Sequence, residues 1–167
     1  MNNMWSPWRS QYIESFHKEK KEEKCIFCNM EDVDPKGLDN LLIYKGKLSY
    51  IIMNLYPYNN GHLMVIPYKH TSNFQDLNNE ELIEMMDLLK LAQQALTEIL
   101  HPEGFNIGLN QGKCAGAGID QHLHFHIVPR WNGDTNFMPV LGEVKIISQD
   151  LIDTKKKLQN YIVSKHL

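Results

Sequence analysis

No stretch of this sequence is apolar for long enough to cross a bilayer, which takes about 20 consecutive residues, and its start lacks the apolar segment of a secretion signal. Cysteine is also scarce: the 167 residues contain 3, an odd number that argues against a disulfide framework. The formal net charge is only -3, which argues against holding a nucleic acid polymer by bulk electrostatics. We therefore expect a cytoplasmic protein that binds neither a membrane nor a nucleic acid polymer.

Internal repeats and low-complexity tracts are absent, and 43% of the residues are hydrophobic, which is enough for a real core. The sequence therefore favours a single domain over residues 1–167. We divide it into an N-terminal extension (1–24) that ends in a strongly charged run, a core (25–130), and a C-terminal tail with a helix (131–167).

The pattern of apolar residues predicts the order of the elements. Apolar runs separated by turn residues predict three strands within 41–67 and a fourth at 104–110. A weaker helical stripe, interrupted by three lysines, predicts a helix after Ser148. With the long helix described next, this order predicts an α+β domain: an antiparallel sheet with one long helix packed on it and a C-terminal helix.

The long helix is the clearest local signal. Asn78 and Glu81 have the spacing of a capping box, and apolar residues then recur at helical spacing until Pro102. We expect the two methionines of this stripe, Met85 and Met86, to lie in the core.

Three histidines alternate with apolar residues in the stretch QHLHFHIVPRW, residues 121–131. Residues i, i+2 and i+4 of a strand lie on one face, so His122, His124 and His126 share a face while the residues between them turn to the core. We expect Pro129 to end this strand, because proline cannot donate a hydrogen bond to a neighbouring strand.

This histidine row permits more than one chemistry. Alternate histidines can bind a zinc ion, or one neutral imidazole can attack while an acceptor orients its far nitrogen. Coincidence is improbable among 8 histidines. The preceding segment GKCAGAG favours catalysis, because Gly112, Gly116 and Gly118 can expose backbone N–H groups to phosphate oxygens, although a flexible turn has the same composition.

Other residues are ambiguous when taken alone. Cys25 and Cys28 form a CxxC pair, which is half of a tetrahedral zinc site, but also fits a redox pair or two buried thiols. We expect His62 to be a packed, hydrogen-bonded histidine. Arg130 is expected to contact either a phosphate or a carboxylate.

Together these residues resemble the histidine triad superfamily of nucleotide hydrolases and transferases, and the resemblance covers most of the chain. It is most similar to the bacterial diadenosine tetraphosphate hydrolase or phosphorylase branch. The segments that carry the resemblance are HLHFHIVPR (122–130), NQG (110–112), NLYPYNNGHLMVIPYKH (54–70), WSPWRSQYI (5–13), CIFC (25–28) and PRWNGDTNFMPVLGEVK (129–145).

The resemblance implies a reaction in which His124 attacks the α-phosphorus and forms a nucleotidyl-histidine intermediate. His126 would hydrogen-bond the phosphate or the leaving group, and no divalent metal is implied at the reaction centre. The positions that match the family's nucleotide-binding residues are Asn54 at the ribose, Ile52 and Leu55 at the base, and Asn110, Gly112, Gly116 and Gly118 at the phosphates.

The resemblance also implies a closed, structural zinc site made by Cys25, Cys28, His70 and His122, without an organic cofactor. The histidines would then divide the work: His122 holds the metal, His124 attacks and His126 assists. A catalytic zinc held by all three histidines is the competing interpretation, and it would leave the two cysteines unexplained.

The loop before the histidine row departs from the family pattern. Asn110 precedes His122 by 12 positions, which is longer than in many relatives, and the loop lacks the usual glutamine. The glutamine contact to the leaving or bridging atom is therefore not carried over. The expected activity is cleavage of a dinucleoside polyphosphate such as diadenosine tetraphosphate, by water or by phosphate. A nucleoside phosphoramidase and a non-catalytic nucleotide sensor are the alternatives, and the resemblance implies a homodimer.

Overall fold

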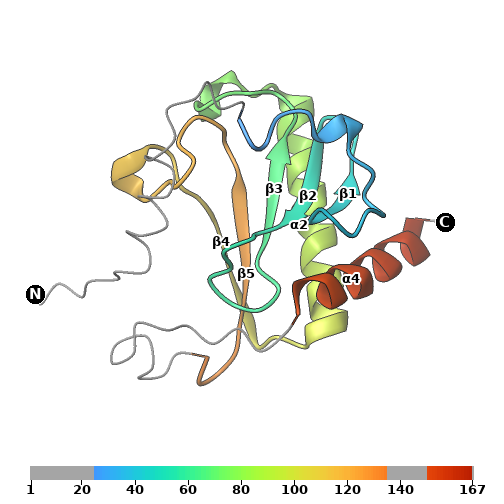
Figure 1. Cartoon of the computed structure of the whole chain (residues 1–167). Helices are drawn as coiled ribbons and strands as arrows, with labels where there is room; N and C mark the ends of the chain where they lie inside the picture. The colour runs from blue at the N-terminus through green and yellow to red at the C-terminus, as the bar shows by residue number, and fades with distance from the viewer. Residues whose placement is uncertain (1–24, 135–149, 167) are drawn as a thin grey trace, which may run out of the picture.

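The computed structural model of the chain describes residues 25–134 and 150–166. The N-terminal extension (1–24), including the segment 5–13, and most of the tail before the last helix lie outside these residues. In the described part, five strands form one sheet in the order β1-β2-β3-β5-β4, and every neighbouring pair is antiparallel (Figure 1). The predicted α+β class, with its antiparallel sheet, is confirmed.

The elements follow the predicted order. The strands are β1 (Leu42–Lys45), β2 (Ser49–Met53), β3 (Leu63–Pro67), β4 (Gly104–Leu109) and β5 (Phe125–Arg130). The helices are α2 (Asn79–Leu100) and α4 (Leu151–His166), with short 3-10 helices η1 (Met30–Asp32), η2 (Phe74–Asp76) and η3 (Lys113–Ala115). None of the described helices is long and apolar enough to cross a membrane.

The strand of the histidine row starts later than the sequence predicts. β5 begins at Phe125, so His122 and His124 lie in the irregular segment before it. The alternation nevertheless persists through this segment, because Leu123 and Ile127 are both buried in the core beneath the helices. The shared face of the histidines therefore does not require a regular strand along their whole length.

The prediction that Pro129 ends this strand is wrong, because β5 continues to Arg130 and Pro129 pairs with Phe105 of β4. The carbonyl of Pro129 accepts a hydrogen bond from Asn59 Nδ2 (3.1 Å), so residue 129 makes its backbone contacts on the β3 side. The pairing of β5 with β3 has already ended at Ile127. The missing N–H of Pro129 therefore removes no bond between strands.

Helix α2 begins where the capping box predicts. Asn78 Oδ1 accepts from the backbone N of Glu81 (2.9 Å), and Glu81 Oε2 accepts from the backbone N of Asn78 (2.8 Å); such a cap stabilises a helix by about 1 kcal/mol. Met85 is buried as expected, but the expectation for Met86 is wrong, since it is 42% exposed. One residue further along turns a side chain by about 100° around the helix, away from the sheet.

The C-terminal helix is also confirmed, and two residues of its apolar stripe, Leu158 and Ile162, pack into the core. Lys155, which the sequence indicates as an interruption of the apolar stripe, is itself buried. Its Nζ donates to the carbonyl oxygens of Gly37 (2.5 Å) and Asn40 (2.9 Å). The lysine thereby joins α4 to the segment that leads into β1.

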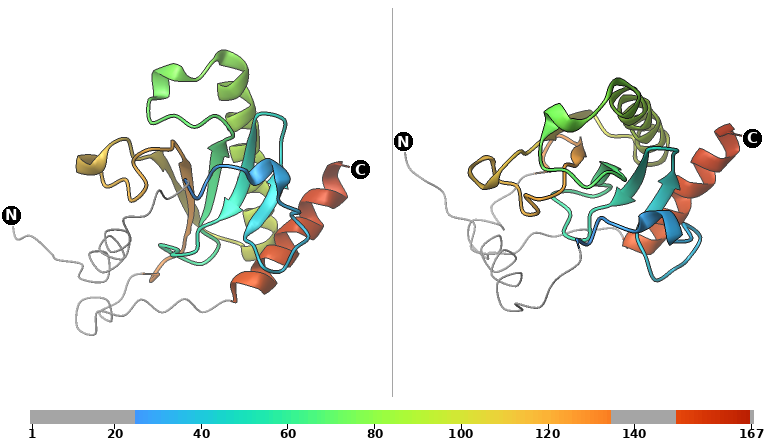
Figure 2. Two further views of the ribbon diagram at one scale, coloured as in Figure 1. Left: turned by 45° about the horizontal axis from the view of Figure 1, so that its top comes forward. Right: turned by 90° about the horizontal axis from the view of Figure 1, so that it is seen from above.

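The two faces of the sheet are covered differently. Helices α2 and α4 pack over one face and form the main core with it, whereas residues 25–33 lie over the other (Figure 2). On this second face Phe27, Tyr50 and Met64 form a separate apolar cluster with neighbouring residues. Met64 pairs with His126 across β3 and β5, so the histidine row lies on this face, away from the helices.

Candidate active site and metal centre

The three histidines of the row lie side by side and are almost fully buried, with 1%, 4% and 9% of the surfaces of His122, His124 and His126 exposed. The rings of His124 and His126 are 4.8 Å apart between centroids and nearly perpendicular. The ring of Phe27 packs against the rings of His122 and His124, with ring centroids 5.7 Å and 5.2 Å apart, respectively. The segment 25–28 thus forms one wall of the row.

The backbone fixes which nitrogen of His124 carries a proton. Its Nδ1 lies 2.8 Å from the carbonyl oxygen of His122, and a carbonyl can only accept, so Nδ1 is the N–H. In a neutral ring the other nitrogen, Nε2, then keeps its lone pair. Burial lowers the pKa of His124 below its ordinary value, which favours this neutral form.

His126 is the opposite tautomer of His124, and a hydrogen bond from His62 determines this. The backbone N–H of Tyr58 donates to Nδ1 of His62 (3.0 Å), so His62 carries its proton on Nε2. That N–H faces Nδ1 of His126 at 2.9 Å, which must accept. A neutral His126 therefore carries its proton on Nε2.

The row consequently offers two different functions next to each other. His124 presents a nitrogen lone pair, which is a nucleophile, and His126 presents an N–H, which can stabilise a developing negative charge. The tautomers of both histidines are fixed by hydrogen bonds that are already present in the folded chain. Such preorganisation is what nucleophilic attack on a phosphorus atom requires.

The first histidine of the row faces another group of residues. Nε2 of His122 donates to the carbonyl oxygen of Pro67 (2.8 Å), so the lone pair is on Nδ1. This Nδ1 lies 3.4 Å from Cys25 Sγ, and Nδ1 of His70 lies 3.3 Å from Cys28 Sγ. The predicted ligand set therefore comes together, from residues far apart in the sequence.

The geometry and chemistry of this set fit a tetrahedral metal ion. The four ligand atoms of Cys25, Cys28, His70 and His122 all lie within 4.8 Å of one another; the ligands of a tetrahedral zinc ion are about 3.5 Å apart. Burial, and then the neighbouring Cys25, raise the pKa of the Cys28 thiol, because two adjacent thiolates repel each other. A divalent cation between them removes this repulsion, so the cluster can hold a metal ion.

The residues predicted to bind the nucleoside lie at the end of β2. The side chain of Asn54 contacts His62 Nδ1 (3.3 Å) through Nδ2 and accepts from the backbone N of Tyr56 (3.0 Å). Ile52 belongs to the apolar cluster of Phe27, whereas Leu55 is exposed. Asn54 is therefore close to the histidine row through His62, and Ile52 is close to it through Phe27.

The predicted phosphate loop connects β4 to the histidine row. Asn110 follows the end of β4, and Gly112 and Gly116 have φ angles of 81° and 89°, which suit glycine. The amide of Gly116 donates to the carbonyl oxygen of Lys113 (3.0 Å), so that N–H serves the loop itself. Gly118 is exposed two residues further on.

Sequence reasoning did not identify the roles of His62 and Phe27. His62 is a packed, hydrogen-bonded histidine, as expected, but its contact with His126 depends on the pairing of β3 with β5, which no local pattern reveals. In the sequence, Phe27 lies between the two cysteines, and only this position indicated that it is close to the metal centre. Arg130 binds the carboxylate of Asp134 with two hydrogen bonds (2.6 and 2.8 Å), so the carboxylate alternative is confirmed.

Comparisons with known proteins identify similar chains. Residues 36–133 match the HIT domain family. The chain is 37% identical over 163 residues, 95% of this chain and 83% of the relative, to "AP-4-A phosphorylase" of Mycobacterium tuberculosis. It is 31% identical over 108 residues, 65% of this chain and 75% of the relative, to the adenosine 5'-monophosphoramidase hnt1 of Schizosaccharomyces pombe. Among solved structures, a zinc-bound histidine triad family protein from Mycobacterium smegmatis matches with a TM-score of 0.67 and 27% identity over 86% of this chain and 96% of that one.

Proposed function

The chain belongs to the HIT domain family of nucleotide hydrolases and transferases, and from this premise we propose that it cleaves dinucleoside polyphosphates such as diadenosine tetraphosphate through a nucleotidyl-histidine intermediate. The observation that carries the proposal is the pair of opposite tautomers in the row. His124 directs a lone pair from Nε2, while His126 has its N–H at Nε2.

These tautomers suit the two ends of the breaking bond. Nε2 of His124 attacks the α-phosphorus, and the bond from this phosphorus to the bridging oxygen breaks, so that the electron pair leaves with the oxygen. The N–H of His126 stabilises the negative charge on the phosphate or the leaving group. The carbonyl oxygen of His122 accepts from Nδ1–H of His124 and stabilises the positive charge that the ring gains on attack.

The acceptor then attacks the same phosphorus, and the P–N bond breaks with return of its electron pair to Nε2 of His124. With water the product is a nucleoside monophosphate, and with inorganic phosphate it is a nucleoside diphosphate. Similarity to the M. tuberculosis AP-4-A phosphorylase, over 95% of this chain, favours phosphate.

A nucleoside phosphoramidase is the second candidate. The chain is 31% identical to a phosphoramidase of S. pombe over a shorter part of its length, and the same intermediate would form by cleavage of a P–N bond in a smaller substrate. A nucleotide sensor would retain the row without turnover.

We propose that the ion at the metal centre is a structural zinc, held by Cys25, Cys28, His70 and His122. Support comes from the cluster itself and from the zinc-bound relative of M. smegmatis. When bound, the ion cross-links the segment of Phe27 to the histidine row. A zinc held by the three row histidines is disfavoured, because His126 accepts through Nδ1 and carries its proton on Nε2, and because the lone pair of His122 on Nδ1 faces Cys25.

The substrate contacts of the proposal follow the positions described above. Asn54 binds the ribose, and Ile52 and Leu55 flank the base. The phosphates are bound by the loop residues Asn110, Gly112, Gly116 and Gly118. The proposal includes a homodimer, which is supported by β4: it is one of the two edge strands of the sheet and carries an Ile107 that is 47% exposed.

Product analysis tests the function. The protein and its His124→Ala variant are incubated with diadenosine tetraphosphate, with and without inorganic phosphate. AMP plus ATP indicates hydrolysis, whereas ADP plus ATP formed only with phosphate indicates phosphorolysis; both must disappear in the variant. Cleavage of adenosine 5'-phosphoramidate alone would establish the second candidate, and nucleotide binding with no product from any substrate would support the sensor.

A further inference from the structure

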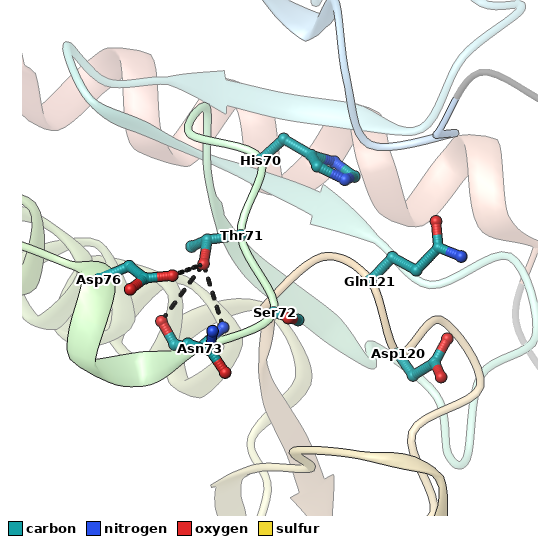
Figure 3. A pocket seen from close by; sticks show the side chains of 7 residues that line it. All are labelled: His70, Thr71, Ser72, Asn73, Asp76, Asp120 and Gln121. Carbon is teal, nitrogen blue, oxygen red and sulfur yellow. Dashed lines mark hydrogen bonds between the residues drawn. The ribbon is translucent and has the colours of Figure 1, made fainter.

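A polar pocket lies beside the histidine row, on the side of His122. It has a volume of about 510 Å3 and is lined by His70, Thr71, Ser72, Asn73, Asp76, Asp120 and Gln121 (Figure 3). This volume is within the range of about 300–1,000 Å3 that small-molecule sites occupy. Neither the nucleophile nor the residues proposed to bind the first nucleoside line it.

Hydrogen bonds hold the two walls of this pocket in place. Residues 70–76, which follow β3, form one wall, and Asp120 and Gln121 form the other (Figure 3). Thr71 Oγ1 donates to the carboxylate of Asp76 (2.6 Å), and the carbonyl oxygen of Thr71 accepts from the backbone N of Leu123 (2.7 Å). The second bond ties the first wall to the histidine segment, so the pocket keeps a fixed position relative to the row.

The charges of the lining disfavour a phosphate chain. None of the seven lining residues is a lysine or an arginine, and Asp76 and Asp120 are acidic. Two lysines of the described residues lie nearby, and both are engaged: Lys69 Nζ donates to the carbonyl oxygen of Asp76 (2.5 Å), and Lys113 Nζ lies 3.6 Å from the carboxylate of Asp120. A neutral group with hydroxyls is favoured there, because carboxylates accept hydrogen bonds from hydroxyl groups.

The uncommitted side chains of the pocket suit a nucleoside. Ser72, Asn73 and Gln121 make no side-chain hydrogen bond within the described residues of the chain. The two amides each offer donors and an acceptor, which match the edge of a base, and the carboxylate of Asp120 can accept from a ribose hydroxyl. Phosphates fit the histidines and the glycine loop better, so only a nucleoside part of the substrate remains for this pocket.

The position of the pocket indicates which nucleoside it takes. Gln121 precedes His124 by three residues, so their Cα atoms are at most about 11 Å apart. That span is comparable to an extended polyphosphate chain whose first phosphorus lies at His124. We propose that the pocket binds the distal nucleoside of a dinucleoside polyphosphate, the one that departs with the leaving group; this inference rests on the proposed function.

Two substrates that differ only in the distal nucleoside test the inference. Initial rates are measured with diadenosine tetraphosphate and with adenosine 5'-tetraphosphate for the wild type and for an Asn73→Ala/Gln121→Ala double variant. Loss of two neutral hydrogen bonds raises KM for the dinucleotide about tenfold and leaves KM for adenosine 5'-tetraphosphate unchanged. Gln94→Ala, on the exposed face of α2, is the matched control and should change neither value.

The outcomes separate this inference from the function beneath it. If the wild type cleaves both substrates and the double variant changes both KM values equally, or neither, the pocket does not bind the distal nucleoside, while the proposed function stands. If the wild type cleaves neither substrate, the proposed function fails, and the inference fails with it. A single Ser72→Ala variant repeats the comparison, and circular dichroism establishes that each variant is folded.

Discussion

Nε2 of His62 donates to Nδ1 of His126 across 2.9 Å. This contact decides which nitrogen of His126 carries a proton, although His62 lies outside the alternating row. His62 is itself fixed by the backbone N–H of Tyr58, which donates to its Nδ1 (3.0 Å). The protonation pattern of the proposed active site is therefore set by the loop between β2 and β3.

Replacing His62 tests this relationship. His62→Ala removes the donor to His126, so the proton of His126 can move to the wrong nitrogen, and we expect kcat for diadenosine tetraphosphate to fall about 100-fold. His62→Gln retains an amide N–H at this place and should lose only about tenfold. In both variants KM should change less than kcat, because His62 is not among the proposed substrate contacts and reaches the nucleoside-binding residues through Asn54 (3.3 Å).

The tautomer itself provides a second readout. The 15N chemical shifts of His126 distinguish a protonated Nε2 from a protonated Nδ1, and we expect a mixture in His62→Ala but one form in the wild type. A kcat that stays unchanged in His62→Ala, or identical losses in both variants without a shift of the tautomer, would show that His62 is only a packing residue.

Removal of a thiol tests the metal centre. Wild-type protein purified without chelators should contain about one zinc per chain. Cys28→Ser should contain nearly none and should unfold at a lower temperature, because metal binding contributes to the free energy of folding. Elemental analysis and thermal unfolding measure the two effects.

Cys114 supplies the matched control for this experiment. It is exposed in η3 and does not belong to the cluster, so Cys114→Ser should keep both the metal content and the unfolding temperature. Less than about half an equivalent of zinc in the wild type, or equal metal content in the two serine variants, would remove the zinc assignment.

Local signals in the sequence predict part of this structure well. The capping box of Asn78 and Glu81 fixes the start of α2 because both partners lie within one helical turn. The common face of His122, His124 and His126 follows from side-chain alternation, which holds even before β5 begins. These features depend on neighbours in the sequence.

The features that local patterns do not predict depend on tertiary register. His62 reaches His126 only because β3 pairs with β5, and Lys155 is buried only because a loop 115 residues earlier supplies carbonyl oxygens. Pro129 is tolerated inside β5 because the pairing of β5 with β3 stops at Ile127, opposite the first residue of β3. The ligands His70 and His122 were paired with the cysteines through the family resemblance, since spacing alone leaves a CxxC pair ambiguous.

The buried Lys155 is predicted to stabilise the attachment of α4. Lys155→Met keeps most of the volume but leaves the carbonyl oxygens of Gly37 and Asn40 without their donor. An unsatisfied buried acceptor is costly, so we expect the free energy of unfolding to fall by about 3 kcal/mol. Lys156→Met is the matched control because Lys156 is exposed, and urea unfolding measures both. Equal stability of the two variants would contradict this role.

Tyr68 is predicted to make stability depend on alkaline pH. Burial first, and then the carboxylates of Glu31 and Glu84, raise the pKa of Tyr68 from 10.0 to about 12. Between these values the unfolded chain releases the proton and the folded chain keeps it. The contribution of Tyr68 to stability is therefore fully present below pH 10 and is lost as the pH rises toward 12.

In Tyr68→Phe this proton is absent, so the free energy of unfolding should decline less steeply between pH 10 and 12 than in the wild type. Urea unfolding at several pH values measures the slope, and the difference in tyrosinate absorbance between the wild type and Tyr68→Phe follows the titration of Tyr68, because the chain contains 7 tyrosines. Tyr161→Phe, on the C-terminal helix, is the control, since its hydroxyl makes no hydrogen bond within the described residues. Identical slopes for wild type and Tyr68→Phe would mean that the Tyr68 hydroxyl titrates in the folded protein as it does in the unfolded chain.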